Sequence, residues 1–149
     1  MDVATLAARE AIRDLVAAYA HAADRGRFED LLALFTPDGT IELADGRTFA
    51  GTAAIRDFLT VSAASLGDAT GSRYVRHHVS SHHILLEAPE RARGFAYFLV
   101  VTERGPDHWG RYHDECLRTA DGWRFARRRI RVEGWAPGSW AGGRPGKAR

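Results

Sequence analysis

The sequence is poor in cysteine and in long apolar runs, and each shortage excludes a class of protein. Its single cysteine, Cys116, cannot form an internal disulfide, which excludes a disulfide-stapled domain and favours a reducing compartment. No apolar run approaches the roughly 20 residues of a membrane-spanning helix, and the start MDVATLAARE lacks the charged and apolar regions of a signal peptide. We therefore expect a cytoplasmic protein that does not contact a membrane.

A strongly basic surface is also missing, although the pI is near 9.0. The net charge is only +2, and the segment AGGRPGKAR (141–149) carries three basic residues and no acid. In RFARRRIRV, alternation places Arg127, Arg129 and Arg131 together on one solvated face of a strand. These observations argue against a nucleic-acid partner and predict a domain over 1–140 followed by a disordered basic tail over 141–149.

Histidine is plentiful, with four residues in YVRHHVSSHHI (74–84). In a straight strand, His77 and His83 share one face about 20 Å apart, and His78 and His82 share the other about 13 Å apart. Ligands of one zinc ion must lie within about 2.1 Å of it. Because the sequence also has no HExxH motif, no paired CxxC motif and no nucleotide-binding loop, we expect neither a metal nor a cofactor.

The first half of the chain has the apolar spacing of helices. Residues 3–23 are predicted to form a first helix with one apolar stripe, and RFEDLLALF (27–35) is predicted to form a short second helix. The segment GTAAIRDFLTVSAAS is predicted to form a third helix, capped by Thr52. Gly26 is expected to end the first helix, TPDG to form a turn before a short strand TIEL, and ADGR to form a hairpin turn. The first stripe consists of Ile12, Leu15, Val16, Tyr19, Ala20 and Ala23.

From Tyr74 onward the apolar period changes to two, which predicts four long antiparallel strands at 74–87, 92–104, 108–119 and 123–135. Three helices before a curved antiparallel sheet predict an α+β cone-shaped barrel with an interior pocket between helices and sheet. The segment GFAYFLVV is apolar on both faces, so a homodimer, or a trimer, is expected to cover the outer face.

Several segments resemble the SnoaL-like branch of the nuclear transport factor 2-like superfamily. They are YAHAADRGRFEDLLALFTPDGTIEL, GTAAIRDFL, RHHVSSHHI and GRYHDECLRTADGWRFARR, and the resemblance extends over residues 6–135. The superfamily includes scytalone dehydratase, bile acid 7α-dehydratase, ketosteroid isomerase, polyketide cyclases and the β subunits of ring-hydroxylating dioxygenases. Such a resemblance implies the fold more strongly than the reaction.

The resemblance implies a catalytic set of Asp24, His77 and Tyr19. Both dehydratases have an aspartate at the Asp24 position and a histidine near the start of the first long strand, which matches His77. The bile acid enzyme also has a tyrosine five residues before its aspartate, as Tyr19 stands to Asp24. A carboxylate that accepts one imidazole N–H orients the ring, and the other ring nitrogen can then move a proton. Tyr19 would hydrogen-bond a substrate carbonyl or its oxyanion.

The remaining polar candidates are assigned by strand parity and by the resemblance. His83 shares the pocket-side parity, His78 and His82 face the other side, and His21 and His108 are expected on the surface. On the third long strand, alternation allows either His113 or the Tyr112/Asp114 pair inward, and both are kept as alternatives. Thr102 matches the position of a second histidine in scytalone dehydratase, and Trp135 or Trp140 could close the pocket mouth. Expected substrate-binding residues are therefore His113, Thr102, Tyr112 and Trp135.

The resulting hypothesis is a cofactor-free acid–base enzyme, a dehydratase or isomerase that acts on a hydrophobic oxygenated ring compound such as a polyketide or steroid-like metabolite. The alternatives are a non-catalytic binding or assembly subunit, like the dioxygenase β subunits, and an aldol-type polyketide cyclase. A filled interior, or an Asp24 carboxylate in water, would favour the non-catalytic subunit.

Overall fold

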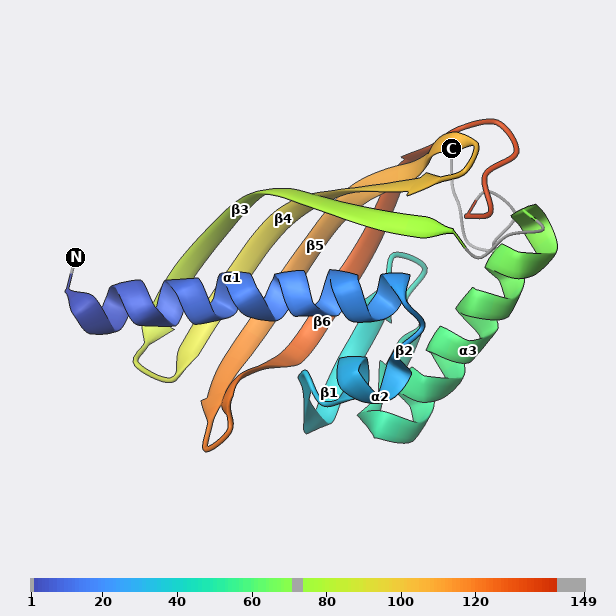
Figure 1. Ribbon diagram of the computed structural model, residues 1–149. Coiled ribbons are helices and arrows are strands. Elements are labelled where there is room, and N and C mark those ends of the chain that lie inside the picture. Colours follow the sequence, from blue (N-terminus) through green and yellow to red (C-terminus); the bar gives the residue numbers. More distant parts are fainter. Residues whose placement is uncertain (1, 71–73, 142–149) are drawn as a thin grey trace.

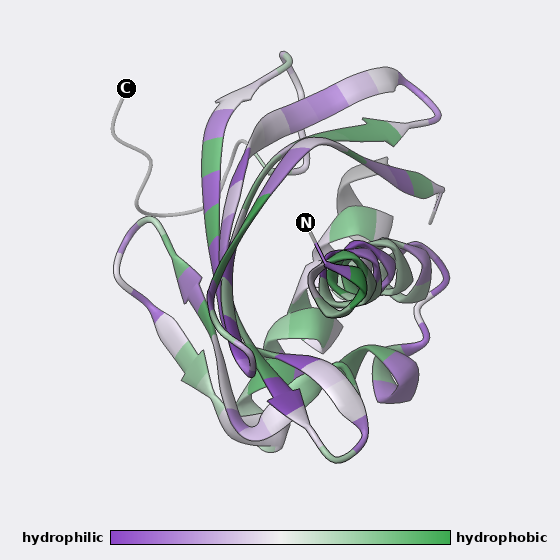
Figure 2. Ribbon diagram, turned by 90° about the vertical axis from the view of Figure 1, so that its left-hand side faces the viewer, coloured by the Kyte–Doolittle hydropathy of each residue, from purple (hydrophilic) through white to green (hydrophobic). Residues whose placement is uncertain are grey.

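Three helices and one six-stranded sheet form the α+β architecture that the sequence predicts. The computed structural model describes residues 2–70 and 74–141. The sheet is curved and not closed into a barrel, and the helices lie on its concave side (Figure 1). Seen along α1, the strands bend around the helix, so the interior lies between helices and sheet (Figure 2).

The first helix, α1 (Val3–Asp24), forms where the apolar stripe predicts it. The Asp2 side chain caps its start by accepting a hydrogen bond from the Thr5 N–H at 2.7 Å. Gly26, with φ of 65°, ends the helix, and the Arg27 N–H turns back to the Ala22 carbonyl at 2.9 Å. This termination makes Asp24 the last helical residue, beside His77 of the sheet.

The second helix is shorter than predicted, because the following strand begins early. Helix α2 spans Phe28–Leu32, and strand β1 (Phe35–Leu43) includes the TPDG segment that we expected to be a turn. Between Phe35 and Thr40 the parallel pairing of β1 with β6 is irregular, so these residues bulge within the strand. Gly39 permits this geometry, since a Cβ atom there would lie 2.9 Å from the Thr36 carbonyl oxygen. The predicted turn is therefore a strand irregularity.

Strand β2 (Thr48–Ala50) and helix α3 (Gly51–Thr70) follow the predicted Asp-Gly hairpin. The turn closes through the Gly46 N–H and the Leu43 carbonyl at 3.0 Å. The third helix begins at Gly51, one residue before the cap that we predicted at Thr52, and it continues beyond the predicted segment.

The four long strands are close to their predicted positions: β3 (Val75–Ala88), β4 (Arg91–Thr102), β5 (Gly105–Thr119) and β6 (Gly122–Trp135). The sheet order is β2-β1-β6-β5-β4-β3, and only the β1–β6 pair among the described strands is parallel. Strand β3 is therefore an edge strand, and α1 packs beside it through Arg9, which donates to the Ile84 carbonyl at 2.8 Å. This packing brings the end of α1 to the start of β3.

Two strand irregularities overturn the predicted orientation of three histidines. In β3, Ser80 pairs with Tyr97 and His83 pairs with Phe95, so one extra residue is inserted, and Ser81 has a positive φ of 52°. The insertion reverses the parity that held at His77, so His82 lies half-buried toward the interior and His83 is exposed. Our assignment of these two residues was wrong, because simple alternation does not continue through a bulge.

The second irregularity is in β5. Val101 pairs with Pro106 and Val100 pairs with His108, so Asp107 is the inserted residue. Asp107 and His108 are both 6% exposed, although neighbours in a regular strand face opposite sides. The prediction that His108 is a surface residue was wrong, whereas His21 is exposed as predicted.

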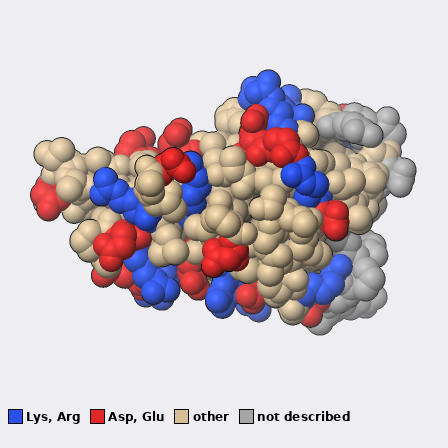
Figure 3. Space-filling view, turned by 90° about the horizontal axis from the view of Figure 1, so that it is seen from below, with Lys and Arg blue, Asp and Glu red and all other residues tan. Residues whose placement is uncertain are grey.

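The exterior carries interleaved charge. Arg127 and Arg129 form outer-face ion pairs with Glu115 at 3.4 Å and Glu42 at 3.2 Å. On the face shown in Figure 3, basic and acidic side chains are mixed, without a continuous basic surface. Along the two described stretches, no helix combines the length and apolar character needed to cross a bilayer. Of the predicted tail, Ala141 is buried at 2% exposure, and residues 142–149 lie outside the described part.

Candidate active site

A pocket of about 500 Å³ lies between α1, α3 and the concave face of the sheet. Its volume is in the range of small-molecule sites. Much of the wall is apolar and aromatic, including Phe28, Phe58, Leu66, Phe98, Ile130 and Trp135. Four polar rings also line it: Tyr19, His77, His108 and Tyr112. The lining also includes the charged side chains of Asp45, Arg47, Arg131 and Glu133, and the combination of apolar and polar groups suits a hydrophobic ligand that carries oxygen atoms.

Asp24 and His77 form a pair at the edge of the sheet. The Nδ1 atom of His77 lies 2.7 Å from Oδ1 of Asp24, and the side chains are 15% and 9% exposed. The His77 backbone N–H also donates to the same carboxylate, at 3.1 and 3.2 Å to its two oxygens. Because β3 is an edge strand, this N–H is available to α1 instead of to another strand. The contact places the proton on Nδ1 and leaves Nε2 as the basic nitrogen.

Two tyrosine side chains line the pocket wall. Tyr19 is 4% exposed and packs edge-on against Tyr112, with ring centroids 6.2 Å apart. Tyr112 is 3% exposed and stacks on Phe98 at 4.5 Å. Burial raises the pKa of both tyrosines, so each stays protonated at neutral pH and can donate a hydrogen bond to a ligand oxygen.

A fully buried ion pair supports these rings from behind. Arg128, with no exposed surface, donates from Nε and Nη2 to the two oxygens of Asp114 at 2.9 and 2.7 Å. Its guanidinium carbon lies 4.1 Å from the centroid of the Tyr19 ring and 4.2 Å from that of Tyr112. The guanidinium therefore makes cation–π contacts with the ring faces of both pocket tyrosines.

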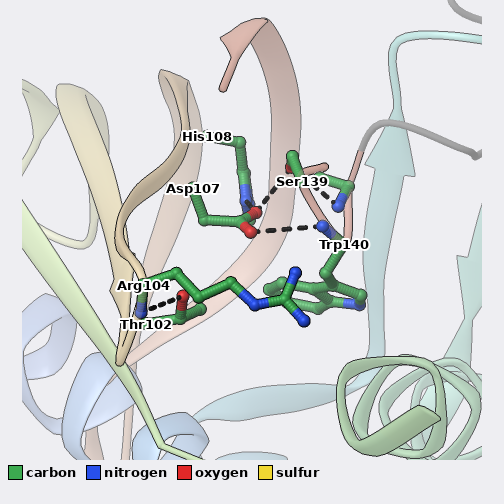
Figure 4. Close-up of polar contacts among 7 residues, drawn as sticks. Thr102, Arg104, Asp107, His108, Ser139 and Trp140 are labelled. Carbon is green, nitrogen blue, oxygen red and sulfur yellow. Dashed lines mark hydrogen bonds and ion pairs between the residues drawn. The ribbon is translucent and has the colours of Figure 1, made fainter. Parts of the chain in front are cut away.

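A second aspartate–histidine pair lies in the same pocket, and sequence reasoning missed it. His108 Nδ1 is 2.7 Å from Oδ2 of Asp107. The segment that follows β6 covers this carboxylate: Ser139 Oγ donates to Oδ2 at 2.6 Å, and the Trp140 N–H donates to Oδ1 at 3.1 Å (Figure 4). In the sequence, Asp107 and His108 are adjacent, and adjacent residues of a regular strand face opposite sides. The pair could be predicted only if the bulge were known.

Only some of the expected substrate-binding residues line the pocket. Tyr112 and Trp135 line the pocket, as does Trp140. His113 lies on the outer face against Phe95, with ring centroids 5.1 Å apart, because alternation turns its neighbours Tyr112 and Asp114 inward. The expectation that His113 faces the ligand was therefore wrong. Thr102 is buried but does not line the pocket, and its hydroxyl accepts a hydrogen bond from the Arg104 N–H at 3.3 Å.

No metal-binding group is evident within residues 2–70 and 74–141, where no three histidine, cysteine, aspartate or glutamate side chains gather as one ion would require. That the protein needs neither a metal nor a cofactor stays a prediction.

Comparison with known proteins identifies the family of the chain. The profile of the SnoaL-like domain matches residues 4–129. The chain belongs to the SnoaL-like domain family. This membership confirms the resemblance seen in the sequence, and the match runs from α1 to the middle of β6.

Several solved structures share the fold. A candidate scytalone dehydratase from Novosphingobium aromaticivorans is 25% identical, with 91% of each chain covered and a TM-score of 0.78. A nuclear transport factor 2-like protein with a cystatin-like fold from the same organism is 25% identical, with 92% of this chain and 89% of that chain covered and a TM-score of 0.75. A hexachlorocyclohexane dehydrochlorinase, LinA-type3 from Novosphingobium barchaimii, is 18% identical over 91% of this chain and 93% of that chain, with a TM-score of 0.75. A search of curated proteins gives no match.

Proposed function

We propose that the protein is an acid–base enzyme that removes water from, or isomerises, a hydrophobic ring compound bearing a carbonyl group. The observation that carries this proposal is the Asp24–His77 pair, held at 2.7 Å on the wall of an apolar pocket. A 25% identical relative is described as a candidate scytalone dehydratase, which is consistent with an elimination reaction. A polyketide or steroid-like metabolite would suit the size and apolar wall of the pocket.

The proposed reaction begins with proton removal by His77. Its Nε2 atom takes a proton from the carbon next to the substrate carbonyl, and the C–H electrons form an enolate. Asp24 stabilises the resulting imidazolium, and a hydroxyl from Tyr19 or Tyr112 donates a hydrogen bond to the enolate oxygen. When the carbonyl re-forms, the bond to a β-hydroxyl group breaks, and that group takes a proton and leaves as water. In an isomerisation, the enolate is reprotonated at another carbon.

Two alternatives predict different structures or products. A non-catalytic assembly subunit would have a filled interior or an Asp24 carboxylate in water, whereas this chain has an open pocket and an Asp24 side chain that is only 9% exposed. These features favour the enzyme. An aldol-type cyclase would use the same enolate but form a carbon–carbon bond, so its product distinguishes it from a dehydratase.

The proposal is tested with a panel of β-hydroxycyclohexanones, unsubstituted and aryl-substituted, by following loss of water with mass spectrometry. Asp24→Asn and His77→Gln are each expected to lower kcat by about 10²- to 10⁴-fold with a smaller change in KM. The double variant should lose little more, because the two residues act as one unit. The matched control is His78→Gln, which alters the adjacent exposed histidine on the opposite face. If the wild-type enzyme turns over a substrate and His77→Gln turns it over equally fast, the proposal is overturned.

A further inference from the structure

The Asp107–His108 pair has the position and support of a second proton-transfer group. Register places it in the same row of the sheet as the first pair, two strands away: His77 pairs with Val100, and Val100 pairs with His108. Both histidines line the pocket, in one row across three adjacent strands. Two strand spacings separate their backbones by about 10 Å, which leaves room for one ring of a ligand between them.

The chain is built locally to direct His108 inward with its carboxylate. Asp107 is the extra residue of the β5 bulge, and the bulge puts two sequence neighbours on one side of the strand. His108 is only 6% exposed, and its ring packs edge-on against Phe98 at 5.9 Å and Trp140 at 5.1 Å. These contacts fix the ring plane beside the pocket, where an exposed surface pair would be free to rotate.

The segment after β6 fixes the other partner. Each oxygen of the Asp107 carboxylate accepts a hydrogen bond from this segment, one from the Ser139 hydroxyl and one from the Trp140 N–H. The Ala136 N–H also donates to the Asp107 carbonyl at 2.8 Å. Burial disfavours the Asp107 carboxylate, but the hydrogen bonds that it accepts outweigh this effect and hold its pKa below the ordinary value. An ionised Asp107 orients His108 and stabilises its protonated form.

We propose that His108 is the catalytic acid that protonates the departing hydroxyl group, with Asp107 and Ser139 as its positioning residues. This inference rests on the proposed function, in which His77 removes the proton from carbon. The N–H bond of His108 breaks as the hydroxyl oxygen gains its proton, the C–O bond breaks, and water leaves. The α-proton remains on His77, and exchange with solvent restores both imidazoles. Because the two histidines stand two strands apart on the concave face, one imidazole does not have to reach both the α-hydrogen and the β-hydroxyl oxygen.

Two reactions of simple ketones separate the roles of the two histidines. Cyclohexanone in D₂O has no leaving group, so its enzyme-catalysed α-deuterium exchange requires proton removal alone. Dehydration of β-hydroxycyclohexanone requires protonation of the departing hydroxyl group as well as proton removal from carbon. His108→Gln is expected to lower kcat for dehydration by about 10²- to 10⁴-fold, with a much smaller change in KM, and to slow exchange less than about tenfold. His77→Gln should slow both reactions by about 10²- to 10⁴-fold, because both need proton removal from carbon.

Ser139→Ala is the milder variant if His108→Gln does not fold. It removes one hydrogen bond to Asp107 and should lower the ratio of dehydration to exchange several-fold. His83→Gln, an exposed histidine on β3, is the matched control and should leave that ratio unchanged. If wild type catalyses neither reaction, the proposed function fails. If wild type catalyses both and His108→Gln or Ser139→Ala leaves the ratio unchanged, the role of His108 is overturned while the proposed function stands.

Discussion

Replacing Arg128 tests whether the buried ion pair beneath the pocket tyrosines stabilises the fold. Arg128→Met keeps much of the side-chain volume but leaves the Asp114 carboxylate, which is 2% exposed, without its cation. The change removes two hydrogen bonds, of 2.9 and 2.7 Å, and the contacts of the guanidinium with the rings of Tyr19, Tyr112 and Phe125. An uncompensated buried carboxylate is the largest of these losses, because water cannot reach it.

The expected cost follows from measurements on other buried pairs. Removal of one partner typically lowers the free energy of unfolding by about 3–5 kcal/mol. A domain of this size loses about 2–4 °C of melting temperature per kcal/mol, so Arg128→Met should melt about 6–20 °C lower than wild type. The double variant Arg128→Met/Asp114→Leu should recover part of the loss, because it removes both charges from the interior.

The neighbouring residue offers a matched control. Arg127 lies on the opposite face of the same strand, is 37% exposed, and pairs with Glu115 at 3.4 Å. Arg127→Met should change the unfolding free energy by about 1 kcal/mol or less, since solvent screens an exposed pair. Urea unfolding followed by circular dichroism measures all three variants. Equal losses for Arg127→Met and Arg128→Met would refute the reasoning, because burial would then make no difference to the pair.

Other features of the described chain give further expectations. Burial lowers the pKa of His82, so the unfolded chain binds more protons and the free energy of unfolding should fall as pH drops below about 6.5. In urea unfolding, His82→Gln should reduce this dependence of the unfolding free energy on pH, and an unchanged dependence would contradict the expectation. Burial raises the pKa of the Cys116 thiol to about 12, so a disulfide reagent at neutral pH should label only unfolded protein, and rapid native labelling would count against this. The outer sheet face exposes 57% of Tyr97 and 42% of Trp109, so we still expect a homodimer; light scattering that gives a monomer at micromolar concentration would contradict it.

The sequence by itself determined most of the elements, and the family resemblance it carries identified the first aspartate–histidine pair. A helix needs only its apolar stripe and a terminator, and the stripe through Ile12 and Tyr19 with Gly26 after it is local information. The period of two after Tyr74 likewise predicted four antiparallel strands. Family resemblance then selected Asp24 and His77, which the fold brings to 2.7 Å.

Only the tertiary structure decided which polar side chains share the interior. Parity counted along the sequence is valid until a bulge inserts one residue, and the partner strand that defines the bulge is distant in the chain. For that reason His82 and His83 face the sides opposite to those predicted, and Asp107 and His108 lie on one side of the strand. The burial of Arg128 required Asp114 from the neighbouring strand, and the support of Asp107 required Ser139 from beyond the last strand. Because these partners meet only after the sheet has paired, no local pattern in the sequence specifies them.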